Sequence, residues 1–151
     1  LYWFGSKEQL LFGVVDHAVA ELGDELTAAA LSAGPTLEHQ VRAVVDATFR
    51  LGSTRPELLA VVREVTRLGP PASTHLARAA EPLVDAAAAA LSGDTTVDPE
   101  RIGTVVLAAG ARVVGLATEA QVRADLGLPA DLRWLRVRRR TLVADLLTDL
   151  S

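Results

Sequence analysis

The chain has 151 residues, of which half are hydrophobic and 23% are charged, and its formal net charge is −4 at pH 7. This length and composition suit one globular domain with a full hydrophobic core, and they exclude a disordered chain. The sequence has no cysteine, which excludes a disulfide framework and thiolate chemistry. Its negative charge argues against a broad nucleic-acid-binding surface, and without a signal-peptide pattern we expect a cytoplasmic protein.

Apolar residues recur at spacings of three and four along the whole chain, and no period-2 alternation of Val, Ile and Thr is present. This periodicity predicts an all-α fold, a helical bundle of about six helices joined by short loops. Capping residues, prolines and glycines set the expected boundaries, including a capping box at Thr54 and a kink at Pro82. The expected helices span residues 7–31, 37–51, 54–68, 73–91, 98–126 and 132–150.

The fifth expected helix is apolar on all sides, because Arg112 is the one charged residue between Ile102 and Thr118. A membrane span needs about 20 apolar residues, so this shorter segment with a central Arg does not predict a membrane partner. We interpret it as a helix that packs inside the domain on one side and on a second subunit on the other.

The sixth expected helix carries a leucine stripe and several arginines. Together with the fifth helix, it predicts a homodimer in which the last two helices of each subunit form a four-helix interface. Arg139 projects into the stripe and is expected to meet an acid of the partner. The expected interface residues are Leu135, Arg139, Leu142, Leu146 and Leu150.

Catalytic and metal-binding motifs are absent from the sequence. The three histidines His17, His39 and His75 pair with no cysteine and form no His-x3-His motif, so we expect no metal and no cofactor. No nucleophile stands in a recognisable motif, so the sequence does not predict an enzyme. We interpret His17 and His39 as surface residues.

Polar residues on apolar helix faces are the expected ligand-pocket residues, namely Thr48, Thr66, His75 and Arg112. For the two threonines, a hydroxyl bonded to its own backbone is an equally good explanation. Arg112 would select an acidic group on a ligand, but we favour an internal ion pair with Glu119 or Glu64. Few aromatic residues face inward, which favours an aliphatic or mixed-polarity small molecule over a flat cation.

The first seven residues are Leu-Tyr-Trp-Phe-Gly-Ser-Lys, and Glu8-Gln9-Leu10-Leu11 follow. This string resembles the segment of TetR-family regulators in which the recognition helix ends and the first helix of the regulatory domain begins. The resemblance implies that residues 1–5 are a remnant of a helix-turn-helix domain and that residues 6–151 form the ligand-binding and dimerisation domain. It also implies DNA-backbone contacts by Tyr2 and Lys7, although only Trp3 separates Tyr2 from Phe4, where two residues are common.

The resemblance implies a transcriptional regulator, most often a repressor, that acts as a homodimer. Operator DNA would bind through the upstream domain missing from this chain, and a small-molecule inducer would release it. The sequence opens on Leu and contains no Met, so we expect a longer protein. The alternative is an all-α ligand-binding or interaction module that does not bind DNA.

Overall fold

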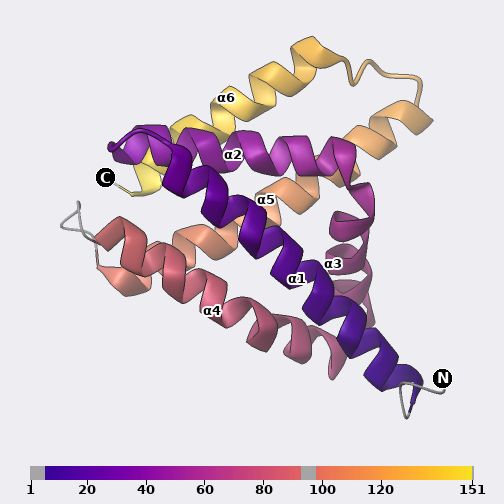
Figure 1. The fold of residues 1–151 in the computed structure, drawn as a ribbon. Coiled ribbons are helices and arrows are strands. Elements are labelled where there is room, and N and C mark those ends of the chain that lie inside the picture. Colours follow the sequence, from indigo (N-terminus) through magenta and orange to yellow (C-terminus); the bar gives the residue numbers. More distant parts are fainter. Residues whose placement is uncertain (1–5, 93–97, 151) are drawn as a thin grey trace.

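The computed structural model describes residues 6–92 and 98–150, and these residues form six helices without a strand (Figure 1). The prediction of an all-α bundle is therefore confirmed. Most boundaries lie within a few residues of the expected ones. The helices are α1 (Lys7–Ser32), α2 (Leu37–Thr54), α3 (Pro56–Leu68), α4 (Ala72–Ser92), α5 (Pro99–Asp125) and α6 (Leu132–Asp149).

Side-chain caps start four of the helices, one of them α5, where Asp98 accepts a hydrogen bond from the Glu100 backbone N–H. The hydroxyl oxygen of Ser6 accepts a hydrogen bond from the Gln9 backbone N–H at 3.1 Å, Thr36 caps α2 in the same way, and Asp131 caps α6. Each cap satisfies one of the backbone donors that a helix leaves unpaired in its first turn. These polar residues therefore fix where the apolar stripe of each helix begins.

The capping box expected at Thr54 is wrong. Thr54 is the last residue of α2, and its hydroxyl donates to the Arg50 carbonyl at 2.9 Å instead of capping the next helix. Helix α3 begins at Pro56 without a side-chain cap. Proline suits that position because the first helical N–H needs no intrahelical partner.

The turn between α3 and α4 begins at Gly69, whose φ of 73° lies in the left-handed region where glycine is favoured. Helix α4 then continues through Pro82. Pro82 has no N–H, so the Arg78 carbonyl one turn earlier lacks its usual helical donor. This leaves a hydrogen-bond acceptor without its α-helical partner on one face of α4.

The buried apolar side chains form two main clusters, which lie at opposite ends of the bundle. The α1–α3–α4 cluster is built on Val15, Val19, Val65 and Ala72. The α2–α5–α6 cluster is larger and contains Ile102, two valines of α2 and the leucines Leu142, Leu146 and Leu150 in and directly after α6. Helix α1 crosses the bundle and contacts α2, α3 and α4, so it joins the two halves (Figure 1).

Candidate functional site

The two residues predicted to contact DNA lie at the N-terminal end. Tyr2 lies outside the described residues. Lys7 is the first residue of α1 and is exposed, at the tip of the bundle where α1 extends beyond its neighbours (Figure 1). The exposed apolar side chains Leu10 and Val14 lie within the next two turns.

Of the four residues predicted to form a ligand pocket, His75 lines one of the two hollows described below, and the other three line neither of them. The Thr48 and Thr66 hydroxyls each donate at 2.8 Å to the carbonyl four residues earlier in their own helix, as in the alternative explanation given above. Thr66 is also exposed. His75 lies on α4 and Arg112 on α5.

Arg112 makes an ion pair, but not with either of the expected partners. Its Nη1 lies 3.2 Å from Oδ2 of Asp149 at the end of α6. Glu119 is occupied by Arg138 at 2.7 Å, and Glu64 pairs with Arg67. The guanidinium therefore links α5 to α6.

His75 borders a cavity. Its Nε2 lies 2.7 Å from Oδ1 of Asp16 on α1, and its ring stacks on Phe12 with centroids 4.2 Å apart. These contacts fasten the start of α4 to α1. The hollow beside the ring has a volume of about 310 Å³ and is lined by Phe12, Pro70, Pro71, Thr74, His75 and Arg78.

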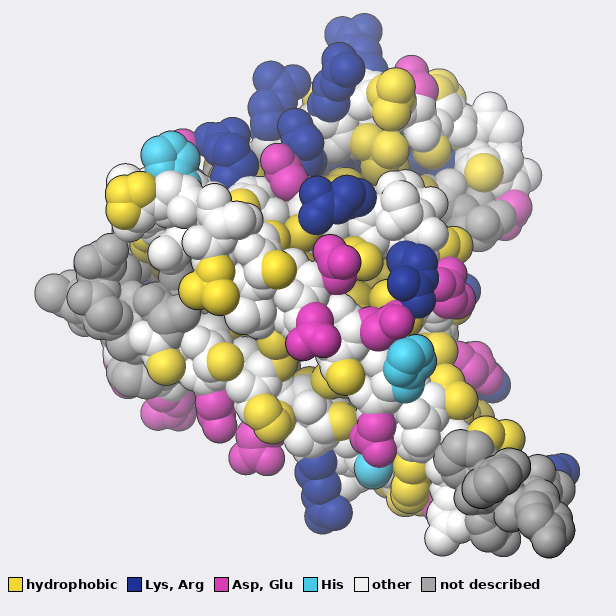
Figure 2. Space-filling model, viewed as in Figure 1, with side chains coloured by type: hydrophobic (Ala, Val, Ile, Leu, Met, Phe, Trp, Pro, Cys, Tyr) yellow, Lys and Arg dark blue, Asp and Glu magenta, His cyan; other side chains and the backbone are white. Residues whose placement is uncertain are grey.

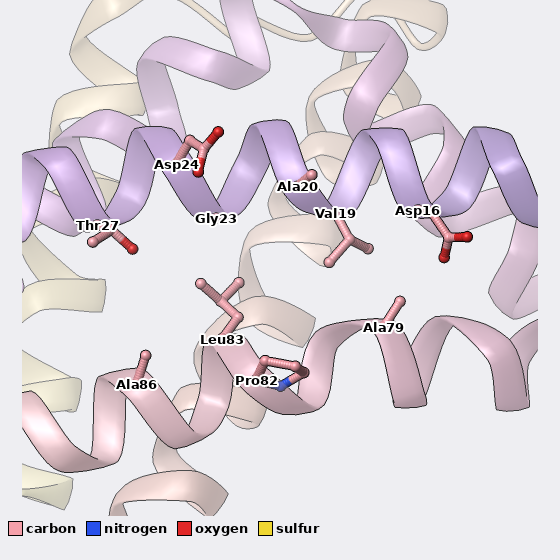
Figure 3. A pocket seen from close by; sticks show the side chains of 10 residues that line it. All are labelled: Asp16, Val19, Ala20, Gly23, Asp24, Thr27, Ala79, Pro82, Leu83 and Ala86. Carbon is pink, nitrogen blue, oxygen red and sulfur yellow. The ribbon is translucent and has the colours of Figure 1, made fainter.

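A longer groove of about 410 Å³ runs between α1 and α4 on the other side of this contact (Figure 3). Asp16 and Val19 point from α1 toward α4, and Ala79 and Leu83 point back toward α1. The helices approach closely at Gly23, where an added Cβ would lie 3.3 Å from Leu83 Cδ1. The α1 wall is formed by Asp16, Val19, Ala20, Gly23, Asp24 and Thr27, and the α4 wall by Ala79, Pro82, Leu83 and Ala86.

The acidic residues of α1 differ in their partners on its two sides. On the side of α2, Glu21 pairs with Arg55 at 2.5 Å and Glu25 lies 3.9 Å from Arg50. On the side of the groove, Asp16 meets only His75, and Asp24 has no partner among the described residues. The groove is therefore the acidic side of α1 that no Arg neutralises.

The junction of α2 and α3 carries the clearest effects on ionisation. The hydrogen bond from Arg55 to Glu57 lowers the pKa of Glu57, and the same contact, with the charge of Glu21, raises the pKa of Arg55. Likewise, Arg67 lowers the pKa of Glu64. All four groups are exposed, so these shifts reflect direct ion pairs in contact with solvent.

The leucines predicted to form the dimer interface instead fill the core of the single chain. Leu142 and Leu146 are 4% and 6% exposed and pack with Leu150 in the α2–α5–α6 cluster. Arg139 also has a partner within its own chain, since its Nη1 lies 3.2 Å from Oδ1 of Asp46. Leu135 is partly buried. The stripe faces inward because α2 and α5 need an apolar partner of their own.

The opposite faces of α5 and α6 carry the exposed apolar surface. On α5, Leu107 is 61% exposed, and Ala111, Gly115 and Val122 follow it on the same face. On α6, Val137 is exposed and shares a face with Thr141, Ala144 and Thr148. The two threonine hydroxyls donate to carbonyls of their own helix, which leaves these faces less polar than the residue names suggest.

Charged side chains are unevenly distributed over the helices. Helix α6 contains five Arg and two Asp. Figure 2 shows Lys and Arg side chains gathered mainly over α6, and acidic side chains over α1 and α4. The molecule therefore has a basic side and an acidic side.

Within the described residues, one segment, Glu100–Asp125, is long and apolar enough to cross a membrane, and only 18% of its most apolar window is buried. A single such helix is weak evidence, since core and interface helices of soluble proteins have the same composition. No group of three or more His, Cys, Asp or Glu side chains in the described part of the chain could hold a metal ion.

No family model and no curated protein matches this chain. A solved structure of a protein of unknown function from Rhodococcus sp. RHA1 is similar to it, with a TM-score of 0.66 and 20% sequence identity. The match covers 97% of this chain and 73% of that chain. At this level of identity the likeness establishes the fold alone.

Sequence reasoning missed the acidic side of the groove. Asp16, Ala20 and Asp24 are four residues apart in turn, a spacing that places all three along one ridge of a helix. This spacing can be read from the sequence. The sequence does not show which neighbouring helix faces that ridge.

Proposed function

We propose that this chain is the regulatory and dimerisation domain of a TetR-family transcriptional regulator. The intact regulator would act in the cytoplasm, bind operator DNA as a homodimer and respond to a small-molecule inducer. It would act most simply as a repressor. Its second candidate function is an all-α ligand-binding module without DNA binding, which the groove between α1 and α4 favours equally.

One observation favours the regulator over the ligand-binding module. Helix α1 begins at Lys7, capped by Ser6, directly after the aromatic segment that resembles the end of a recognition helix. This is where the resemblance requires the first regulatory helix to start. The exposed Leu10 and Val14 near that end offer an apolar seat for an upstream domain.

The way α1 is packed supports control of DNA binding by a ligand. Helix α1 contacts α2, α3 and α4, and one wall of the groove belongs to it. A ligand that prefers one position of α1 would shift the population of the upstream domain to the matching arrangement. Release of DNA requires that the ligand binds the released arrangement more tightly.

The exposed faces of α5 and α6 are the best candidates for the dimer interface. Added Cβ atoms at Gly110 and Gly115 would meet no atom within 4 Å, so no packing inside the chain requires these glycines. Glycine within a helix costs about 1 kcal/mol relative to alanine. A second helix that approaches closely would use the space, and a two-fold axis would pair the same faces of both subunits.

DNA binding tests the proposal directly. The protein extended to include the residues encoded upstream of Leu1 should select a palindromic sequence from random duplexes, with affinity that falls steeply as salt rises. Replacing Lys7 by Gln should reduce the salt slope by about 1, because one phosphate contact is lost. Arg63→Gln, which removes the same charge from an exposed site on α3, serves as the control.

A longer protein that folds but selects no sequence would contradict the regulator and leave the ligand-binding module. Equal salt slopes for the Lys7→Gln and Arg63→Gln variants would remove Lys7 from the DNA contact without affecting the family assignment.

Sedimentation tests the dimer separately. Leu107→Glu and Val137→Glu each place a charge on an exposed face and should convert a dimer of residues 1–151 to monomer. Leu31→Glu, at an 81% exposed position of α1, should leave the dimer intact. An unmodified chain that is monomeric at micromolar concentration would contradict this part of the proposal.

A further inference from the structure

Exposed apolar side chains are concentrated at the turn between α5 and α6. Of the ten large apolar side chains exposed in the described residues, five lie between Val122 and Val137. Three of these are leucines at the turn itself, where Leu126 is 68%, Leu128 is 47% and Leu132 is 71% exposed. We call these three residues the leucine tip. Such a cluster of exposed leucines is typical of a binding surface.

The leucine tip projects from the bundle. In Figure 1 α6 diverges from α2 toward its N-terminal end, and the turn stands clear of the other helices. Leu132 lies three residues before the partly buried Leu135, near the side of α6 that faces the core. It therefore continues the apolar stripe of α6 to a position that no helix of this chain covers.

Contacts between α5 and α6 hold the turn in this position. Nε of Arg123 donates to the Pro129 carbonyl oxygen at 2.9 Å, and the guanidinium of Arg138 pairs with Glu119 at 2.7 Å. The same two guanidinium groups lie 5.4 and 5.9 Å from the centre of the Trp134 ring. The leucines are therefore exposed on a turn with defined contacts at its base.

Three arginines without acidic partners follow the leucine tip. Two other arginines of α6 pair with acidic residues of α5 and α2, as described above. Arg133, Arg136 and Arg140 are exposed and make no ion pair within the described residues. Residues 123–140 contain six Arg and two Asp, a net charge of +4 in a chain whose net charge is −4. In Figure 2 apolar side chains lie beside the Lys and Arg side chains over α6. An anionic partner is therefore favoured at this end of the molecule.

The three arginines stand at graded heights behind the leucines. At a rise of 1.5 Å per residue, they follow Leu132 by about 1.5, 6 and 12 Å along the axis of α6. Apolar groups at a membrane surface enter the boundary between headgroups and acyl chains to a depth of about 5–10 Å. For a tip that enters end-on, Arg136 and Arg140 reach the level of the headgroup phosphates whichever way they point around the helix.

Shape and charge together favour a bilayer over a protein or a nucleic acid. A partner helix docks into an apolar groove, but the leucine tip projects, and neither the hollow beside His75 nor the groove between α1 and α4 lies there. The phosphates of a nucleic acid would pair with the arginines and leave the leucines in water. An anionic bilayer satisfies both, because its acyl chains accept leucine and its phosphates pair with guanidinium groups.

We propose that the leucine tip and the three arginines behind it dock this domain on the surface of an anionic phospholipid bilayer. The leucines enter the boundary between headgroups and acyl chains, and the arginines pair with headgroup phosphates. The contact is peripheral and does not require α5 to cross the bilayer. It also does not depend on the function proposed above.

Co-sedimentation of residues 1–151 with lipid vesicles tests the proposal. Vesicles of equal parts of phosphatidylglycerol and phosphatidylcholine should bind the protein at low salt, with an affinity that falls as salt screens the surface charge. Vesicles of phosphatidylcholine alone should bind at least about tenfold more weakly, because each arginine near an anionic surface contributes about fivefold. Equal binding to both vesicles, or no binding to the anionic ones, would overturn the proposal.

Paired variants locate the contact. Leu132→Asn should weaken binding to the anionic vesicles about tenfold through lost apolar burial, whereas Leu31→Asn, at an 81% exposed position of α1, should leave it unchanged. Arg136→Gln should weaken it about fivefold, and Arg63→Gln, on the exposed side of α3, less than twofold. Circular dichroism checks that each variant keeps its helical content. Unchanged binding in folded Leu132→Asn and Arg136→Gln would refute the proposed surface.

Trp134 reports the depth of the tip directly. It follows Leu132 by about 3 Å along the axis of α6, and in a Trp3→Phe variant it is the one tryptophan of the chain. Phospholipids brominated on their acyl chains should quench its fluorescence when the protein binds anionic vesicles. Bound protein whose Trp134 emission is not quenched would attach through another surface, contrary to the proposal.

Sedimentation without lipid distinguishes the bilayer from a second subunit as the partner of the leucine tip. Leu132→Asn should leave the oligomeric state of residues 1–151 unchanged, because the proposed dimer faces are those of Leu107 and Val137. Conversion of a dimer to monomer by Leu132→Asn would assign the tip to the subunit interface and overturn the proposal.

Discussion

Helices α1 and α5 have nearly the same length, 26 and 27 residues, and they use it differently. Helix α1 contacts three neighbours and buries Val15, Ala18 and Val19 among them. Helix α5 is the segment of the described chain that is apolar enough to span a membrane, yet Leu107 and Val122 face outward. Between Val15 and Ala30, α1 exposes no large apolar side chain, so the polarity of this part matches its surroundings within one chain, whereas that of α5 does not. The mismatch indicates where a second molecule is expected.

The largest effect should come from the inner face of α5. Ile102 is fully buried, so Ile102→Ala should lower the free energy of unfolding by about 2–5 kcal/mol. Leu107→Ala removes a similar volume from the outer face and should cost less than about 0.5 kcal/mol in the monomer. Urea unfolding followed by circular dichroism measures both. A larger Leu107→Ala effect that grows with protein concentration would indicate loss of a dimer contact.

The next effect concerns the buried stripe of α1. Val15 is fully buried and its neighbour Val14 is exposed, so the pair forms a matched comparison one residue apart. Val15→Ala should cost about 2 kcal/mol through lost burial and the cavity it leaves, whereas Val14→Ala should be nearly neutral. The same urea titration applies. Similar losses for both variants would mean that the start of α1 is covered by another part of the protein.

The caps of the two helices should have smaller and similar effects. Ser6 accepts from the Gln9 N–H, and Asp98 accepts from the Glu100 N–H at 3.2 Å. Ser6→Ala and Asp98→Ala should each cost about 1 kcal/mol, while Ser6→Asp should restore the first cap. Thermal unfolding at fixed protein concentration compares them. A neutral Ser6→Ala variant would contradict the start of α1 at Lys7.

The smallest effect is a pH dependence at the junction of α2 and α3, where Arg55 also pairs with Glu21 of α1. Arg55 lowers the pKa of Glu57, so the folded state holds this proton less tightly than the unfolded chain does. The stability from this pair is therefore present above the ordinary pKa of Glu and is lost as pH falls through the lowered pKa. Glu57→Gln should flatten the acid limb of the unfolding midpoint against pH. An unchanged acid limb would show that solvent screens the pair completely.

The sequence predicted the six helices well because their ends depend on local chemistry, such as the caps at Ser6 and Thr36 and the glycine at Gly69. The sequence did not predict which neighbouring helix or subunit covers a given apolar helix face. The stripe of Leu142 and Leu146 has the same spacing whether it covers α2 and α5 or a second subunit. Thr48 and Arg112 were also ambiguous, because the partners that satisfied them depend on the packed structure.

The unbroken path of α1 has a geometric consequence. At a rise of 1.5 Å per residue, its 26 residues extend for about 39 Å, so a tilt of about 5° about one end moves the other by roughly 3 Å. Such a displacement is about the length of a hydrogen bond, and in the regulator proposed above it would make or break a phosphate contact without unfolding a single turn. His75 and Asp16 hold the helix about a third of the way along this arm. A modest shift at that point is therefore amplified at the far end.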